Sequence, residues 1–261
     1  MSHQVSTNDS LLTRQSLVLK IGGNEIDDAA FLAELADVIR SLDMPTVIVH
    51  GGGKEISTLQ HQLGIEPRYL EGIRITDAPS LAVVQMVLCG AVNKRLIRTL
   101  VYGGVDALGL SGVDRGLIRA VKMEHPTEDM GFTGDVTFVR GDILLDMLAQ
   151  GITPVIAPLC LGDDSIYNVN ADHVAGAVAA AIHADRVVFL TNVEGVLVDG
   201  QPVKSLGVEQ THALIEDGTI FGGMIPKVKT ALDSLNRGVH RAVITNLAGL
   251  KSHGGTVFAI E

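Results

Sequence analysis

The chain has 261 residues, of which 46% are hydrophobic, and it carries a formal net charge of −10 at pH 7. That length and apolar content suffice for one large α/β domain or two closely joined lobes with a substantial core. The acidic charge, the lack of Trp and an aromatic content of only 3% argue against a nucleic-acid partner, which would need basic surface and stacking side chains.

The N-terminal part of the chain alternates between short, apolar, β-branched runs and longer amphipathic runs. Such alternation predicts right-handed crossovers and a parallel sheet. Residues 1–15 form a polar lead. The elements expected after it are strands at 17–21, 46–49 and 106–111, and helices from Asp27-Asp28 to about Leu42, from Lys54 to Leu63, and from Asp77 past Leu96.

The stretch 117–140 has a different pattern, because two short β-type segments, 117–121 and 134–139, flank a polar loop. We expect antiparallel β-structure beside the main sheet. The α/β alternation then resumes. Its expected elements are helices at 142–150, from Asp172 to about His183, at 208–217 and at 224–237, and strands at 153–158, 186–191 and 241–245, with an edge strand at 256–260.

Cysteine usage and apolar run length indicate the cell compartment. Cys89 and Cys160 stand in apolar surroundings and belong to no Cys-x-x-Cys pair, so we interpret them as buried free thiols in a reducing compartment. No apolar run approaches the roughly 18 residues of a bilayer span. The lead, Met1 to Gln15, has no signal-peptide core. We therefore expect a cytoplasmic protein with no membrane partner.

The most informative motifs are two glycine-rich turns that directly follow apolar strands. The first is Lys20-Ile21-Gly22-Gly23 and the second is His50-Gly51-Gly52-Gly53. Glycine at a strand-to-helix junction lets the backbone approach a ligand and turns amide hydrogens towards an anion. We expect a phosphate or carboxylate site there. The chain has no P-loop, no Gly-x-Gly-x-x-Gly after a strand and no Gly-x-Ser-x-Gly elbow.

Each further polar motif has a structural and a functional interpretation. Lys20 could simply be exposed at a strand end, and Lys227 could be an ordinary solvated helix lysine. His50 could be a capping or core histidine as easily as a ligand contact. In Asn168-Val169-Asn170-Ala171-Asp172, Asp172 could be an N-cap after a turn. Alternatively, the two amides bind a carboxylate substrate and Asp172 orients lysines.

Taken together and in this order, the motifs resemble the amino acid kinase family. The similarity runs from about Leu17 to the C-terminus and is greatest to members that act on N-acetyl-L-glutamate. It implies a three-layer αβα sandwich with a mainly parallel central sheet, as in carbamate kinase-like folds. Residues 16–180 would bind the amino-acid substrate and dimerise, and residues 181–261 would bind ATP. The strings that carry the resemblance are Lys20–Gly23, His50–Gly53, Gly72–Thr76, Asn168–Asp172 and Gly222–Lys227.

The resemblance implies transfer of the γ-phosphoryl group of ATP to the side-chain carboxylate of N-acetyl-L-glutamate. That carboxylate is ionised at pH 7, so the reaction requires no general base. Mg²⁺ would arrive with ATP, bound mainly through its phosphates and not directly by the protein. The implied catalytic residues are Lys20, Lys227 and Asp172. The implied substrate residues are Gly51, Gly52, Arg74, Asn168 and Asn170, and the implied phosphate and ATP residues are Gly22, Gly23, Thr191, Asn192, Gly195, Gly222 and Gly223.

Two other functions stay open. Asn192 stands where many acetylglutamate-specific members have Asp, so a kinase of carrier-protein-linked aminoadipate or glutamate is an alternative. Such a kinase would need a basic surface to dock its carrier protein. The region of Arg115 and Arg119 is only modestly basic. A non-catalytic nucleotide-binding regulatory protein is the second, against which both lysines argue. The resemblance also implies a homodimer insensitive to arginine, because the lead is short and Asn246–Gly255 is compact.

Overall fold

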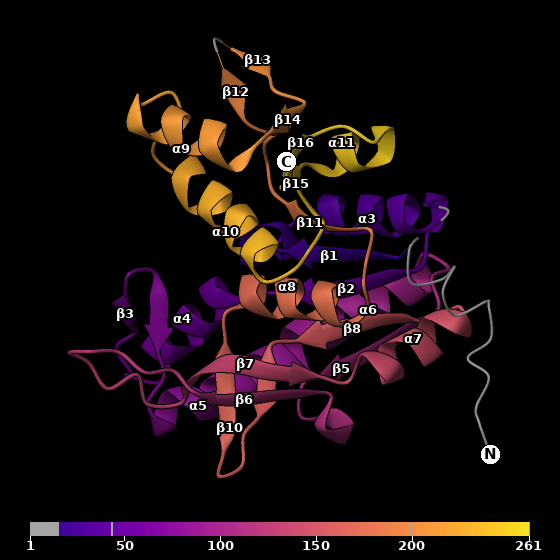
Figure 1. The fold of residues 1–261 in the computed structure, drawn as a ribbon. Coiled ribbons are helices and arrows are strands. Elements are labelled where there is room, and N and C mark those ends of the chain that lie inside the picture. Colours follow the sequence, from indigo (N-terminus) through magenta and orange to yellow (C-terminus); the bar gives the residue numbers. More distant parts are fainter. Residues whose placement is uncertain (1–15, 43, 199, 261) are drawn as a thin grey trace, which may run out of the picture.

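The computed structural model describes residues 16–42, 44–198 and 200–260; the polar lead over 1–15 lies outside the described residues. A sheet of eight strands crosses the molecule in the order β14-β16-β15-β11-β1-β2-β8-β5 (Figure 1). Neighbouring strands run parallel except β15 and β16. The strands are β1 (Leu17–Ile21), β2 (Thr46–His50), β5 (Ala107–Ser111), β8 (Thr153–Ala157), β11 (Arg186–Leu190), β14 (Ser205–Leu206), β15 (Arg241–Thr245) and β16 (Thr256–Ala259).

This sheet confirms the predicted parallel alternation and corrects it at one margin. The segment predicted as the edge strand, β16, is covered by the short strand β14, which forms the true edge. The sequence did not predict β14 because a strand of two residues carries no detectable alternation.

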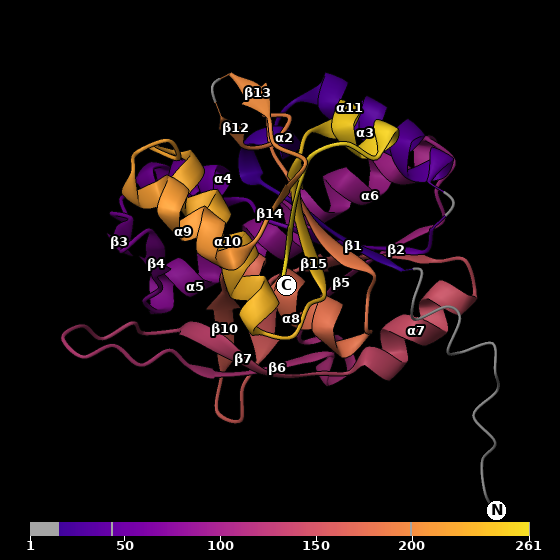
Figure 2. The same ribbon diagram turned by 45° about the horizontal axis from the view of Figure 1, so that its top comes forward.

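Helices cover both faces of the sheet and so confirm the three-layer arrangement (Figure 2). Strand side chains alternate between the faces. Val18 and Val47 pack in the core with α7, α8 and α10, whereas Leu17 and Leu19 pack with the helices of the other face. The first layer comprises α7 (Gly141–Ala149), α8 (Ala171–Ala181), α9 (Val208–Glu216) and α10 (Met224–Asn236). The second comprises α2 (Gly23–Ile26), α3 (Ala29–Ser41), α4 (Gly53–Gln62), α5 (Ala78–Gln85), α6 (Asn93–Tyr102) and α11 (Leu247–Ser252).

The longest helical run joins α5, a π-helical segment η1 (Met86–Val92) and α6. Asp77 caps it with Pro79 in the first turn, as the sequence predicts. The run Ala78–Tyr102 is long and apolar enough to cross a membrane by length and composition alone, contrary to the expectation from the sequence that no apolar run is long enough. A core helix passes the same test, and this one packs Val84, Leu88 and Leu96 into the core. It is therefore weak evidence for a span.

The predicted antiparallel segments are β6 (Ile118–Lys122) and β7 (Thr133–Val139). They close into a four-stranded barrel with β9 (Leu159–Leu161) and β10 (Ile166–Val169), which the sequence did not predict. The barrel brings the Asn168–Asp172 string from β10 towards the main sheet. Two hairpins were also not predicted, namely β3 (Arg68–Leu70) with β4 (Ile73–Ile75), and β12 (Leu197–Val198) with β13 (Gln201–Pro202).

Both cysteines are free thiols, as predicted. Cys160 is fully buried and Cys89 is partly buried, and in each case desolvation raises the thiol pKa. Their chemistry is therefore that of small apolar side chains.

Candidate active site

The two glycine-rich turns lie against each other at the carboxyl ends of β1 and β2. The Gly51 amide donates a hydrogen bond to the Ile21 carbonyl over 2.9 Å. A Cβ on Gly23 would lie 3.3 Å from the Gly53 nitrogen and 3.4 Å from the Gly52 Cα. The backbones thus meet with no room for side chains, and together they form one wall of a cleft.

Lys20 lies at the centre of this cleft. Its side chain is only 18% exposed, and its Nζ lies 2.8 Å from Asp172 Oδ1. The lysine is therefore partly buried and paired, in contrast to the interpretation as an exposed strand end. Lys20 lines three cavities, which we call the inner cavity, the outer cavity and a third, smaller one. Asp172 and Lys227 also line the third.

Asn170, and not Asp172, caps α8. Asn170 Oδ1 accepts a hydrogen bond from the Asp172 amide over 2.8 Å. Asp172 is consequently the second residue of the helix, and its carboxylate is available to Lys20. The positive end of the helix dipole favours a carboxylate in that first turn. The interpretation of Asp172 as a simple N-cap was wrong.

The inner cavity has a volume of about 250 Å³ and brings together all five residues predicted to bind the substrate. Apolar side chains from separate elements, Ile56, Ile73 and Leu88, complete its wall. The five are Gly51, Gly52, Arg74, Asn168 and Asn170.

Arg74 is the buried cation of this cavity. It is only 8% exposed, and its guanidinium donates to the Gly53 carbonyl and Ser57 Oγ, each over 2.9 Å, to the Tyr69 hydroxyl over 2.5 Å, and to Gln60 Oε1. Desolvation lowers the pKa of Arg74. All four partners are neutral, and in the described part of the chain no carboxylate lies within 4.0 Å of it. A buried, unpaired cation is costly unless an anionic ligand compensates it.

A buried hydroxyl pair positions the strand that carries Arg74. Thr133 Oγ1 donates to the Arg74 carbonyl over 2.6 Å, and Thr76 Oγ1 accepts from Asn168 Nδ2 over 3.0 Å. These contacts join β4, β7 and β10 beneath the inner cavity. The sequence assigned neither threonine a role of its own, since an isolated Thr in a β-type run is ordinary.

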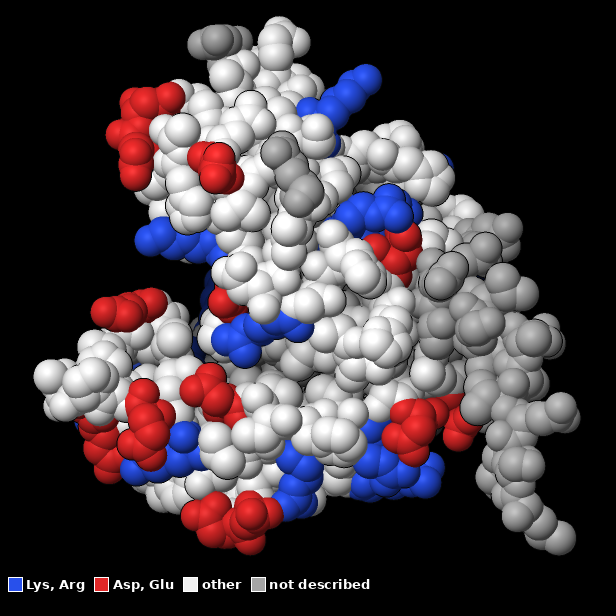
Figure 3. Space-filling view, viewed as in Figure 1, with Lys and Arg blue, Asp and Glu red and all other residues white. Residues whose placement is uncertain are grey.

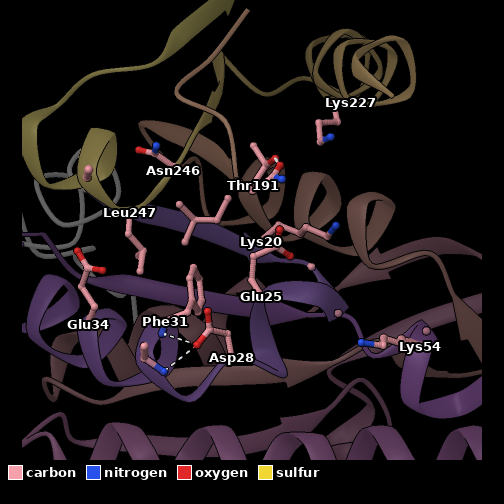
Figure 4. A pocket seen from close by; sticks show the side chains of 17 residues that line it. Lys20, Glu25, Asp28, Phe31, Glu34, Lys54, Thr191, Lys227, Asn246 and Leu247 are labelled. Carbon is pink, nitrogen blue, oxygen red and sulfur yellow. Dashed lines mark hydrogen bonds between the residues drawn. The ribbon is translucent and has the colours of Figure 1, made fainter. Parts of the chain in front are cut away.

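The outer cavity, of about 740 Å³, opens from the glycine turns towards α10 (Figure 4). Four of the residues assigned from the sequence to phosphate and ATP line it, together with Lys227, which was assigned a catalytic role. The four are Gly22, Gly23, Thr191 and Asn192. A neighbouring cavity of about 510 Å³ is more apolar.

Gly195, Gly223 and Lys227 line the apolar cavity together with Phe221 and Met224. Gly195 also has a packing role, since a Cβ there would lie 2.6 Å from Thr256 Oγ1. The remaining predicted residue, Gly222, lines none of these cavities. Its φ of +55° shapes the turn before α10 instead.

Lys227 lies across the outer cavity from Lys20, on the first turns of α10 (Figure 4). Its Nζ lies 3.4 Å from the Gly223 carbonyl of its own helix. Among the ion pairs of the described residues, Asp172 pairs with Lys20 and not with Lys227. The expectation that Asp172 positions both ammonium groups is thus met for one of them. Figure 3 shows the surface hollowed between the part that carries α10 and the part below it.

His50 is a core residue and does not line the cavities. It is completely buried, and its Nδ1 donates to the Gly51 carbonyl over 2.9 Å, while its Nε2 accepts from Asn93 Nδ2 over 3.1 Å. Burial lowers the pKa of His50 to about 4, so the ring is neutral at pH 7. The core interpretation was therefore correct, and the sequence did not identify Asn93 as its partner.

Comparison with known proteins agrees with this arrangement. A model of the amino acid kinase family matches residues 15–246. The chain is 56% identical over 244 residues to the acetylglutamate kinase of Roseiflexus sp. (strain RS-1), with 94% of each chain covered. A crystal structure from Streptococcus mutans UA159 matches with a TM-score of 0.78 and 29% identity over 94% of this chain and 99% of the other.

The likeness of fold extends further. A carbamate kinase from Giardia lamblia bound to AMP-PNP matches with a TM-score of 0.68 over 96% of this chain and 100% of the other, at 16% identity, which shows the fold alone. Because the family model spans nearly the whole sheet and its motifs converge on one cleft, the chain belongs to the amino acid kinase family.

Proposed function

We propose that the chain transfers the γ-phosphoryl group of ATP to the side-chain carboxylate of N-acetyl-L-glutamate, a step of arginine biosynthesis. One observation carries this proposal: Lys20 stands where a small cavity with a buried cation, Arg74, meets the large outer cavity. An amino-acid anion and a nucleotide can therefore meet at one ammonium group. The identity of 56% to an acetylglutamate kinase supports the same substrate.

The chemistry requires two anions to be brought together. The attacking carboxylate is already ionised at pH 7, so positioning and charge stabilisation carry the catalysis. Lys20 and Lys227 face the outer cavity from opposite sides and would stabilise the charge on the transferred group. Asp172 orients Lys20, and the amides of Gly22, Gly23 and Gly52 would line the phosphoryl path. The products are ADP and an acyl phosphate.

The inner cavity matches the polar groups of an acetylated amino acid. Arg74 would bind the α-carboxylate. Asn170 Oδ1 is occupied by the α8 cap, which leaves its Nδ2 as a donor for the acetyl oxygen. Asn168 Nδ2 is occupied by Thr76, which leaves its Oδ1 as an acceptor for the amide hydrogen.

The apolar cavity would hold the adenine ring. Val193, Leu197, Phe221 and Met224 supply its apolar surface, and Phe221 is 73% exposed, ready to cover a flat ligand. From there the phosphates would run past Lys227 towards Lys20.

Mg²⁺ enters the proposal as part of the nucleotide. The described residues contain no group of three His, Cys, Asp or Glu side chains that could hold a metal ion. Asp172, the acidic residue beside Lys20, would therefore act on the ion through water. Bound to ATP, Mg²⁺ neutralises phosphate charge. In this proposal the ion is bound mainly through the phosphates.

We further propose a homodimer that works in the cytoplasm. The strand β5 is an edge of the main sheet, and Met86, Val101, Tyr102 and Leu108 beside it are between 43% and 85% exposed. Exposed apolar side chains next to an open edge favour association with a second copy. Light scattering on the purified protein should give the mass of two subunits, whereas the mass of six would contradict the dimer.

Arginine insensitivity stays a prediction, tested by adding L-arginine to the assay.

The decisive experiment mixes the protein with MgATP and N-acetyl-L-glutamate and traps acyl phosphate as the hydroxamate. Hydroxamate that requires both substrates would support the proposal. ATP binding without hydroxamate would contradict it and direct attention to a carrier-linked acceptor. Against that acceptor, Arg119 is already paired with Asp163, and acidic and basic side chains alternate over the face in Figure 3.

A further inference from the structure

Gln60 occupies an unusual position for a polar residue. It lies on the apolar stripe of α4, one turn after the buried Ile56, and is itself fully buried. Its amide is used at both ends, because Oε1 accepts from Arg74 Nη1 and Nε2 donates to Ser80 Oγ over 2.7 Å. A buried amide with both ends satisfied holds one orientation.

The two partners of Gln60 fix that orientation. Ser80 Oγ accepts from the Gln60 NH₂ group, and the Arg74 guanidinium can only donate. The Gln60 oxygen must therefore face Arg74. Ser80 is itself held in place, because its backbone amide donates to Asp77 Oδ1 over 2.9 Å.

The charge of the cavity follows from this arrangement. A carboxylate of the same length as Gln60 would form a buried ion pair with Arg74 and neutralise it. Gly53, Ser57 and Tyr69 likewise meet the guanidinium with neutral oxygens. Gln60 contacts Arg74 from the buried side, whereas the exposed Tyr69 lies towards the cavity mouth. Gln60 thus supplies an acceptor that orients Arg74 without removing its charge.

We propose that Gln60 is a specificity-determining residue, whose neutral amide keeps the positive charge of Arg74 available for the α-carboxylate of the substrate. This inference rests on the proposed function and deepens it. Gln60 does not touch the substrate, but it determines whether Arg74 can recognise the charge of the substrate. Gln60 acts through Arg74 and is a positioning residue, not a catalytic one.

The test uses two variants that separate charge from shape. Gln60→Glu is nearly isosteric and still offers an acceptor to Arg74, but it adds a negative charge and replaces the donor to Ser80 by an oxygen. Gln60→Leu removes the acceptor and leaves the charge of Arg74 unpaired. A purely structural role predicts that Gln60→Leu is the more harmful variant. If Gln60 instead keeps the charge of Arg74 available, Gln60→Glu is the more harmful variant.

Two substrates make the readout specific. One is N-acetyl-L-glutamate, and the other is its α-carboxamide, which keeps the reacting side-chain carboxylate but lacks the α-charge. A hydrogen bond to a charged group contributes about 1.5–3 kcal/mol, which corresponds to about 10- to 100-fold in kcat/KM. The wild-type protein should prefer the acid by that factor.

In Gln60→Glu the preference for the acid over the carboxamide should fall by at least about tenfold, with the KM for ATP unchanged. The assay should run from about pH 6 to pH 9, so that the introduced carboxyl is ionised at the upper end. Gln60→Leu should keep the preference. Undiminished preference in Gln60→Glu at every pH would overturn the proposal, as would equal loss for both substrates.

Wild-type activity separates this inference from the proposed function. If the wild-type protein forms no acyl phosphate, the proposed function fails, and calorimetric binding of the same acid and carboxamide to the three proteins still tests Gln60. If the wild-type protein is active but Gln60→Glu discriminates normally, the assignment of Gln60 alone fails.

Discussion

Lys20 Nζ and Asp172 Oδ1 lie 2.8 Å apart and join the end of β1 to the first turn of α8. Both side chains are mostly buried, at 18% and 23% exposed, so the cost of desolvating the two charges offsets much of their attraction and the pair contributes little to stability. Its effect is geometric. It holds an ammonium group at the junction of the inner and outer cavities, where the transferred phosphoryl group would lie.

Removing either lysine should suppress catalysis. A single donor to a transition-state charge contributes about 2.7–4 kcal/mol, so Lys20→Ala and Lys227→Ala should each lower kcat by at least about a hundredfold. Hydroxamate formation at saturating substrates measures this. Lys229→Ala is the control, because Lys229 is exposed two residues further along α10 and should leave kcat unchanged. Near-normal kcat in both variants would refute the assigned roles.

Asp172→Asn should lower kcat with little change in the melting temperature. The amide keeps the size of the side chain but loses the charge that orients Lys20, so we expect a fall of about tenfold or more, by the energy of a hydrogen bond between charged groups. Asp142→Asn is a matched control. Asp142 also lies in the first turn of a helix and pairs with an arginine, Arg140, over 2.6 Å, outside the cavities. Equal effects of the two variants would mean that Asp172 has no special role.

The sequence predicted those features that depend on local chemistry. Gly22, Gly23 and Gly51 follow apolar strands, and the neighbouring parallel strands bring such turns to one edge of the sheet. The order of strands and helices follows from hydrophobic periodicity in the same way. Gly51 and Gly52 line the inner cavity for this reason, whereas Arg74, Asn168 and Asn170, which also line it, were expected from the resemblance to the family.

Contacts between residues distant in sequence could not be predicted. The barrel depends on pairing of β9 and β10 with β6 and β7, and three or four residues are too few to show alternation. The neutral partners of Arg74 come from α4 and the β3–β4 hairpin. Gln60 did leave a signal, because it is a polar residue at a buried helical position, one turn after Ile56.

Gly52 should not tolerate a side chain. A Cβ there would lie 2.7 Å from Leu88 Cδ2 and 3.2 Å from Val92 Cγ2, so Gly52→Ala would push the glycine turn away from η1. We expect kcat/KM for N-acetyl-L-glutamate to fall by about tenfold or more, as overpacking costs about 1–3 kcal/mol. Leu88→Ala introduced together with it should restore part of the activity, at the expense of stability.

Gly90→Ala is the matched control for Gly52→Ala. Gly90 is exposed on η1, and a Cβ there would meet no atom within 4 Å. Alanine in place of a helical glycine should raise the free energy of unfolding by about 0.5–1 kcal/mol without altering kcat/KM. If Gly52→Ala behaved like Gly90→Ala, close packing of the turn on η1 would have no role in catalysis.

The buried His50 should make stability depend on pH. Its pKa is lowered from 6.5 to about 4 in the folded chain, chiefly by desolvation, so the unfolded chain binds more protons between these values. Stability contributed at this site is therefore complete above about pH 6.5 and is lost as the pH falls towards 4. The difference in pKa corresponds to about 3 kcal/mol. Urea unfolding between pH 7 and pH 4.5 would measure it.

His50→Asn is the informative comparison for that titration. Its amide can still donate to the Gly51 carbonyl but does not titrate, so the variant should lose less stability on acidification than the wild-type protein. Because other groups titrate equally in both proteins, the difference between the two slopes isolates His50. Parallel slopes would show that His50 is not a buried neutral ring, and its hydrogen bonds to Gly51 and Asn93 would then need another explanation.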